Sequence, residues 1–121
     1  GTILIVDDEE ILRTMMTEIL EHAGYSVLSA ANGAEALALY REHQQAIDLV
    51  ITDLLMPVMD GEELIRELKA LQPDVKIIIA TGSLDLAPAE KFLAMNVKKV
   101  ITKPFQIPEL LTTIRQILSA S

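Results

Sequence analysis

The chain has 121 residues, half of them apolar, which suffices for one domain with a buried core spanning residues 1–121. Eighteen acidic and 10 basic residues give a formal charge of −8, so we expect the domain to bind neither nucleic acid nor anionic membranes. The absence of cysteine excludes disulfides, thiolate metal sites and a cysteine nucleophile. The sequence shows no membrane-spanning run or signal peptide, which predicts a cytoplasmic protein.

Short apolar runs alternate with helical patterns in the first half of the chain. The predicted strands are 3–6, 26–30 and 48–52, and the second is polar enough to suit a sheet edge. A helix between the first two strands ends before Gly24, a residue suited to the position just past a helix. Its apolar positions recur at helical spacing and are Ile11, Leu12, Met15, Met16, Ile19 and Leu20. Asn32 caps the next helix, with Glu35 three residues later.

The same alternation continues in the second half. Asp60 and Glu63 have the spacing of a capping box and predict a helix that stops at Pro73. The remaining predicted strands are 75–81 and 97–102. A short helix between them starts near Pro88 and carries Phe92, Leu93 and Met95. The last helix carries Leu110, Leu111, Ile114, Ile117 and Leu118.

Five strands interleaved with five helices predict an α/β, doubly wound fold. Parallel strands need crossover connections, and right-handed crossovers place helices on both faces of the sheet. We interpret Met15, Met16 and Met95 as core or near-core residues, because methionine fills irregular gaps in apolar cores.

Five polar side chains follow strands at the same edge of the predicted sheet. They are Asp7 and Asp8 after the first strand, Asp53 after the third, Thr81 closing the fourth and Lys103 after the fifth. Because the carboxyl ends of parallel strands lie together, we expect these side chains to converge. Three crowded carboxylates bind a hard divalent cation or protons.

This set of side chains suits phosphoryl transfer. A carboxylate can act as a nucleophile and form an acyl phosphate, and we assign that role to Asp53. The carboxylates of Asp7 and Asp8 would hold Mg²⁺, which neutralises charge on the transferring group. Lys103 would supply a fixed positive charge, and the Thr81 hydroxyl a hydrogen bond.

Four segments in order along the chain match a known pattern: ILIVDDE at 3–9, DLLMPVMDG at 53–61, ATG at 80–82 and KPF at 103–105. Over nearly its whole length the chain thereby resembles the receiver domain of bacterial two-component response regulators. The resemblance implies a flavodoxin-like sheet of strand order 2-1-3-4-5. It also implies transfer of a phosphoryl group to Asp53 from the phosphohistidine of a sensor histidine kinase or a phosphotransfer protein.

The resemblance further implies roles for individual residues. Asp8, Asp53 and the backbone carbonyl of Leu55 would ligate Mg²⁺, with Mn²⁺ as an alternative ion, and Asp7 would act through water. Thr81 and Lys103 would bind the new phosphoryl oxygens, and the bond from Lys103 to Pro104 would be cis. The domain would be free-standing, or part of a longer regulator with an effector domain or of a hybrid kinase.

Other interpretations stay open beside this one. Asp7 could serve only to cap the first helix, and we interpret Asp60 and Gly61 as a cap and a turn. A second function is a receiver-shaped interaction module without phosphotransfer. A haloacid-dehalogenase-like phosphatase is disfavoured because Asp7 and Asp8 are adjacent, and an FMN binder because no phosphate loop follows the first strand. A receiver would phosphorylate and dephosphorylate itself, so calling it an enzyme is a matter of definition.

One position departs from the family pattern. Receivers usually place an aromatic residue three positions before the lysine, whereas this chain has Val100 there. A β-branched aliphatic side chain has no ring to swing between exposed and buried positions. We therefore expect the signal to pass through a shifted loop after Thr81, within the segment 81–105, or through other domains of a longer protein.

Overall fold

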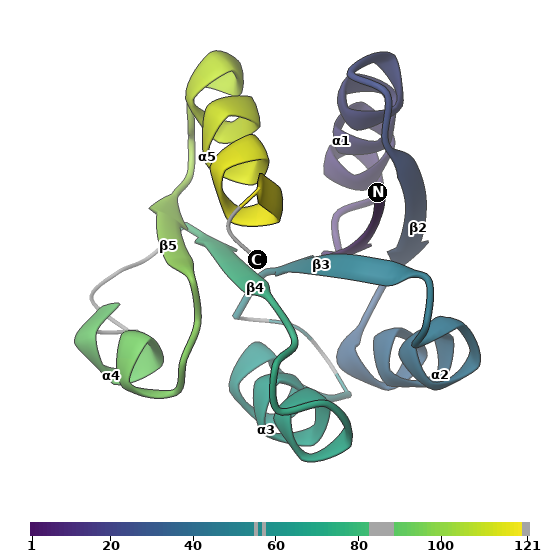
Figure 1. Ribbon diagram of the computed structural model, residues 1–121, viewed down its shortest axis with the longest axis vertical. Helices are drawn as coiled ribbons and strands as arrows, with labels where there is room; N and C mark the ends of the chain where they lie inside the picture. The colour runs from purple at the N-terminus through teal and green to yellow at the C-terminus, as the bar shows by residue number, and fades with distance from the viewer. Residues whose placement is uncertain (55, 57, 83–88, 120–121) are drawn as a thin grey trace.

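A parallel sheet with helices on both faces organises the protein (Figure 1). The computed structural model describes residues 1–54, 56, 58–82 and 89–119. Within these residues the strands are β1 (Thr2–Val6), β2 (Ser26–Ala30), β3 (Ile47–Thr52), β4 (Ile77–Thr81) and β5 (Lys99–Thr102). The helices are α1 (Glu10–His22), α2 (Gly33–His43), α3 (Gly61–Leu71), α4 (Ala89–Ala94) and α5 (Ile107–Ser119). None of these described helices is long and apolar enough to cross a membrane.

The strand order is β2-β1-β3-β4-β5 and every neighbouring pair is parallel, which confirms the predicted flavodoxin-like topology. Helices α1 and α5 cover one face, and α2, α3 and α4 cover the other (Figure 1). Strand β2 lies on one side of β1, and β3, β4 and β5 follow on the other side, so the strand order reverses between β1 and β3. In such sheets, ligands bind outside the carboxyl ends of the strands at this reversal.

Each face of the sheet has its own apolar core. On the α1 and α5 side, the inward residues of the strands pack against side chains such as Met16, Leu20 and Ile114. On the other side, Leu64, Ile65 and Leu68 of α3 are fully buried against the alternate residues of the same strands. Because β1, β3 and β4 are covered on both faces, they contain apolar runs rather than an alternating pattern.

The predicted helix boundaries are confirmed where a capping residue defines them. Asn32 Oδ1 accepts a hydrogen bond from Glu35 N at 2.9 Å, and Asp60 Oδ1 accepts one from Glu63 N at 2.9 Å. Gly24 follows α1 with φ of 100°, a conformation that glycine adopts without steric cost. The predicted helix start near Pro88 lies outside the described residues.

Two predicted strands begin too early. Val75 and Val97 are buried, but both belong to turns: Val75 N donates to Gln72 O at 3.0 Å, and Val97 N donates to Phe92 O at 3.1 Å. Strands β4 and β5 therefore begin at Ile77 and Lys99. A β-branched residue in a buried turn gives the same sequence signal as the first residue of a strand, which explains the error.

Apolar spacing also overestimated how far some helices are buried. Ile11 is 86% exposed, Met15 is 43% exposed and Leu93 is 51% exposed, so the interpretation of Met15 as a core residue is wrong. Met16 is buried as predicted, and Met95 packs at the edge of the core. Only a stripe of an amphipathic helix faces the sheet, and adjacent apolar residues on that helix point in different directions.

Val58 occupies a strained backbone conformation in the loop after β3. Its φ is 70°, in the left-handed region that costs an ordinary L-residue about 1–2 kcal/mol, and its side chain is 80% exposed. We predict that Val58→Asn raises the free energy of unfolding by about 1 kcal/mol, since asparagine tolerates this region and little burial is lost. Urea denaturation measures the change. Val58→Ile keeps the branched side chain and serves as the unchanged control, and an equal stability of both variants would contradict the prediction.

Candidate functional site

Three carboxylates meet where β1 and β3 end. Strand pairing continues to this point, because Asp53 N donates to Val6 O at 3.0 Å. One side-chain oxygen from each of Asp7, Asp8 and Asp53 lies within 4.8 Å of the others. Asp7 is 4% exposed and Asp53 is 8% exposed, whereas Asp8 is exposed. The predicted convergence is therefore present, with two acids within the fold and one at its surface.

Lys103 joins the two buried acids. Its Nζ donates to Asp7 Oδ2 at 2.6 Å and to Asp53 Oδ2 at 2.9 Å. Burial lowers the pKa of Lys103, but the hydrogen bonds and negative charges of Asp7 and Asp53 outweigh that effect and raise the pKa overall. The ammonium therefore stays charged between two carboxylates that would otherwise repel each other.

The other strand ends bring Lys103 and Thr81 to this edge. Lys103 N donates to Thr81 O at 2.8 Å, which ties the end of β5 to the end of β4. Thr81 is buried at this position. The peptide bond between Lys103 and Pro104 is cis, as the resemblance implied.

Both oxygens of the Asp53 carboxylate are held in place. Leu54 N donates to Oδ1 at 2.6 Å, and Lys103 Nζ contacts Oδ2. The side chain is thus fixed in orientation at the mouth of a buried strand.

Asp7 combines two roles that sequence reasoning had treated as alternatives. Its Oδ1 accepts a hydrogen bond from Glu9 N at 2.9 Å, just before α1 begins, while its Oδ2 binds Lys103. Glu9, the residue at the N-cap of α1, makes no side-chain capping hydrogen bond. Asp7 therefore supports the start of the helix and also belongs to the acidic cluster.

The donor set fits a hard divalent cation. Carboxylate oxygens are the ligands that Mg²⁺ prefers, and three of them lie close enough together at this edge to share one ion. Of the residues predicted to bind the metal, the structure brings together Asp7, Asp8 and Asp53. Leu55, whose backbone carbonyl was predicted to complete the set, lies outside the described residues.

Two glycines fix the loop that follows Asp53. A Cβ on Gly61 would collide with the Asp53 carbonyl oxygen and would lie 2.8 Å from Leu54 Cα. A Cβ on Gly33, at the start of α2, would lie 2.6 Å from Met59 O. The interpretation of Gly61 as a structural residue agrees with this contact, whereas nothing in the sequence pattern had singled out Gly33.

Sequence reasoning also missed Arg13. Its Nη1 donates to the backbone carbonyl of Asp7 at 2.6 Å, which brings a further cation to the acidic edge. A basic residue in the first turn of a helix was the available signal, because acidic residues are favoured at that position.

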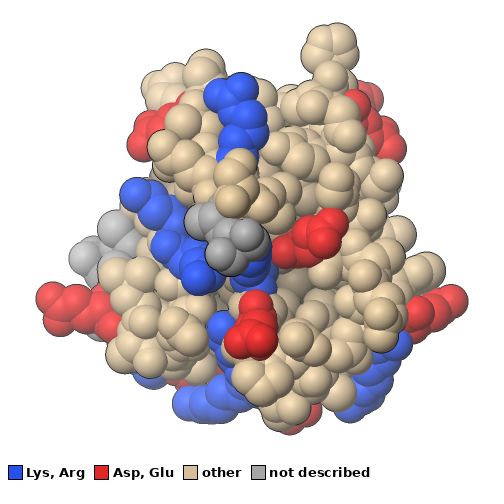
Figure 2. Space-filling model, viewed as in Figure 1, with Lys and Arg blue, Asp and Glu red and all other residues tan. Residues whose placement is uncertain are grey.

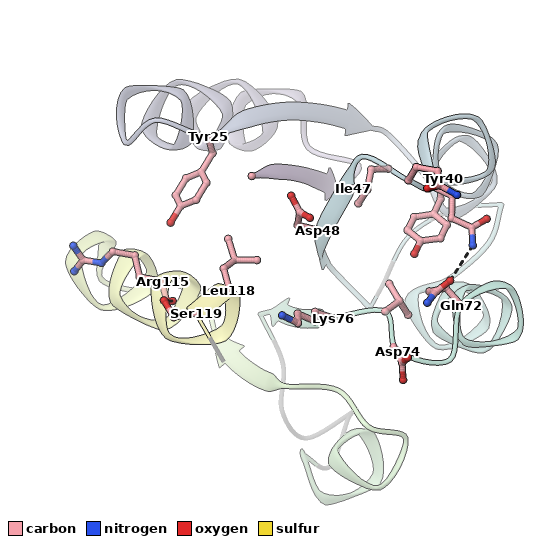
Figure 3. A pocket seen from close by; sticks show the side chains of 14 residues that line it. Tyr25, Tyr40, Ile47, Asp48, Gln72, Asp74, Lys76, Arg115, Leu118 and Ser119 are labelled. Carbon is pink, nitrogen blue, oxygen red and sulfur yellow. Dashed lines mark hydrogen bonds between the residues drawn. The ribbon is translucent and has the colours of Figure 1, made fainter. Parts of the chain in front are cut away.

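A polar pocket of about 690 Å³ lies at the opposite edge of the sheet, where the strands begin (Figure 3). Asp48 near the start of β3, Lys76 before β4 and Arg115 of α5 are among the residues that line it. Acidic and basic side chains both line this pocket, so it does not favour an ion of either sign. None of the predicted site residues is among the described residues that line it.

Acidic and basic side chains are interspersed on the face of the molecule drawn in Figure 2. Although the chain has 18 acidic and only 10 basic residues, the acidic side chains do not form one continuous area on the described part of this face. The convergence of Asp7, Asp8 and Asp53 is thus a local arrangement created by the strand ends.

Comparisons with known proteins give a consistent result. The family model for the response regulator receiver domain matches residues 3–115. Sensor kinase CckA of Brucella abortus is 38% identical over 118 residues, which are 98% of this chain and 12% of that protein. Chemotaxis protein CheY of Halobacterium salinarum is 36% identical over 118 residues, covering 98% of this chain and 97% of that protein. The crystal structure of response regulator protein TrrA from Thermotoga maritima with Mg²⁺-BeF has a TM-score of 0.82 at 31% identity, covering 97% of this chain and 98% of that one.

The tight contact at Gly61 leads to a stability prediction. We expect Gly61→Ala to lower the free energy of unfolding by about 1–3 kcal/mol, because the new methyl group must push the backbone of Asp53 and Leu54 aside. Urea denaturation measures the loss, and the amide chemical shifts of the two displaced residues report where it arises. Gly82→Ala is the matched control, since no described atom lies within 4 Å of its Cβ position. Equal stabilities of the two variants would show that the contact at Gly61 is not limiting.

Proposed function

This chain belongs to the response regulator receiver family, and from that premise we propose that Asp53 accepts a phosphoryl group in a Mg²⁺-dependent reaction. The donor would be the phosphohistidine of a sensor kinase or of a phosphotransfer protein. The observation that carries the proposal is the convergence of Asp7, Asp8 and Asp53 at one sheet edge, with Lys103 bonded to the two buried acids.

The chemical step assigns a task to each side chain. An Asp53 oxygen would form a bond to phosphorus while the bond from phosphorus to the donor imidazole nitrogen breaks, and that nitrogen takes up a proton. The Lys103 ammonium already lies 2.9 Å from Asp53 Oδ2, beside the oxygens that gain charge. The Thr81 hydroxyl, from the end of β4, would donate a hydrogen bond to a phosphoryl oxygen.

A divalent cation would be held by Asp7, Asp8, Asp53 and the backbone of Leu55. When bound, it neutralises charge on the transferring phosphoryl oxygens and so reduces their repulsion by the acidic cluster. We propose Mg²⁺ as this ion, with Mn²⁺ as a substitute, because both prefer oxygen ligands.

The two relatives differ in how much of their length this domain matches. It spans 12% of the sensor kinase and 97% of the chemotaxis protein, so the reaction is compatible with a hybrid kinase, a regulator with an effector domain, or a free-standing receiver. In each case we propose a cytoplasmic domain that phosphorylates and dephosphorylates itself. An interaction module without phosphotransfer is the weaker candidate, because the complete set of acids, threonine and lysine is present.

The central prediction concerns Asp53. Incubation with acetyl phosphate and Mg²⁺ should add one phosphoryl group to the wild type, detected by intact mass, and none to Asp53→Asn, which lacks the nucleophile. Asp48→Asn is the matched control, because it makes the same change at the other end of β3 and should be phosphorylated normally. A wild type without an adduct, or an Asp53→Asn variant with one, would rule out the proposed reaction.

The output of the domain would involve the segment 81–105. Val100 packs partly buried against the core and has no ring, so it cannot act as the rotating aromatic residue that is usual in the family. Lys91 of α4 pairs with Glu62 of α3, and Lys69 Nζ of α3 donates to Asn96 O, in the turn after α4, at 3.1 Å. Phe92 of α4 packs in the core and is 3% exposed, whereas Leu93 is 51% exposed. Ion pairs near the surface contribute little to stability, so the pair of Lys91 and Glu62 would not by itself oppose a shift of α4.

We therefore predict that phosphorylation changes amide chemical shifts throughout 89–100, beyond the residues that contact the phosphoryl group. The measurement compares nuclear magnetic resonance spectra with and without acetyl phosphate at saturating Mg²⁺. Asp53→Asn under the same conditions corrects for the effect of the phosphodonor itself. Changes confined to the immediate neighbours of Asp53, Thr81 and Lys103 would contradict an output through this segment.

A further inference from the structure

Arg13 contacts the backbone of the acidic cluster rather than its carboxylates. Its Nη1 donates to Asp7 O at 2.6 Å, and it forms no ion pair with any carboxylate in the described part of the chain. Asp7 is buried, so its carbonyl oxygen needs a partner within the protein. Arg13 supplies that partner from a half-buried position on α1.

The helix geometry explains why Arg13 can reach this carbonyl. Side chains on a helix lean toward its N-terminus, so a residue in the first turn covers the segment that precedes the helix. Arg13 is the fourth residue of α1, and the preceding segment is the turn formed by Asp7, Asp8 and Glu9. The guanidinium therefore lies over the backbone that carries two of the cation-binding acids.

This position does not serve the helix itself. A positive charge near the N-terminus of a helix opposes the macrodipole, and α1 already has the acidic residues Glu9 and Glu10 at its start. The contact instead supports the turn, whose other support is the hydrogen bond from Glu9 N to Asp7 Oδ1. Asp7 is thus held through its carbonyl by Arg13 and through its carboxylate by Glu9 and Lys103.

Asp8 depends on this turn more than the other acids do. Its side chain is exposed and makes no hydrogen bond or ion pair with a described residue, whereas Asp7 and Asp53 are both bonded to Lys103. The direction of the Asp8 carboxylate is consequently set by the backbone between Asp7 and Glu9. A change in that backbone would move one ligand of the proposed cation relative to the other two.

We propose that Arg13 is a positioning residue, which holds the turn after β1 so that Asp7 and Asp8 present their carboxylates together for cation binding. The inference rests on the proposed function, in which these acids bind Mg²⁺. Groups that orient metal ligands typically contribute a factor of about 10–100 to metal affinity or activity. Arg13 would act in this way through a backbone carbonyl.

Two effects of removing Arg13 have opposite signs, which makes the inference testable. If the arginine only added positive charge near the site, its removal would strengthen Mg²⁺ binding, because cations repel each other. If it positions the turn, removal would weaken Mg²⁺ binding despite the lost charge. Arg13→Met removes charge and hydrogen bond together, and Arg13→Lys keeps the charge while replacing the planar donor group.

The experiment measures the Mg²⁺ dissociation constant without phosphodonor. The chain has no tryptophan, so binding is followed by the amide shifts of Asp8 and Asp53 during a Mg²⁺ titration. We expect the constant to rise about tenfold in Arg13→Met and by a smaller factor in Arg13→Lys. Arg41→Met, on the exposed side of α2, makes the same charge change and should bind Mg²⁺ as the wild type does. An unchanged or tighter constant in Arg13→Met would overturn the inference.

A second measurement keeps the test independent of folding and of the proposed function. Urea denaturation establishes whether each variant is folded. If Arg13→Met does not fold, the comparison uses Arg13→Lys alone. The initial rate of phosphorylation by acetyl phosphate is then measured against Mg²⁺ concentration. A positioning role predicts that half-saturation shifts while the rate at saturating Mg²⁺ returns to within about threefold of the wild type. A rate that stays low at saturation would overturn the inference, whereas a wild type that binds no Mg²⁺ would refute the proposed function itself.

Discussion

Asp7 and Asp53 lie buried side by side at the carboxyl edge of the sheet, and the site depends on the Lys103 ammonium that contacts both of them. Two buried carboxylates repel each other, because like charges interact strongly away from water. Lys103 places a positive charge between the two acids and offsets this repulsion. The same lysine then lies beside the oxygens that would receive the new charge.

The fold keeps these groups in position by steric as well as electrostatic means. Close contacts at Gly61 and Gly33 fix the loop after β3 against the starts of α3 and α2. Arg13 holds the turn after β1 from the other face of the sheet. The loops around Asp53 are therefore supported from both layers of helices, although each of these contacts involves only backbone or a single side chain.

Helix α4 is anchored in the core by Phe92, which is 3% exposed. Lys91 of α4 pairs with Glu62 of α3, and Lys69 of α3 donates to Asn96 O in the turn after α4. Leu93 of α4 faces solvent. Burial together with the nearby Lys98 lowers the pKa of Lys69. In the proposed function, this part of the protein would transmit the change of charge at Asp53. Val100 shows that this chain would do so without the usual aromatic residue.

The sequence by itself determined the order of the elements, the caps at Asn32 and Asp60, and the placement of the acids, Thr81 and Lys103 at one sheet edge. These features depend on local periodicity and on the rule that parallel strands end together, so they can be derived without coordinates. Only the tertiary structure decided that Lys103 binds Asp7, 96 residues away, and Asp53, 50 residues away. It also decided which apolar residues of α1 face solvent and which backbone atoms Gly33, Gly61 and Arg13 contact. Those contacts depend on distances between segments that are remote in sequence, and a residue pattern carries no information about such distances until the layers are packed.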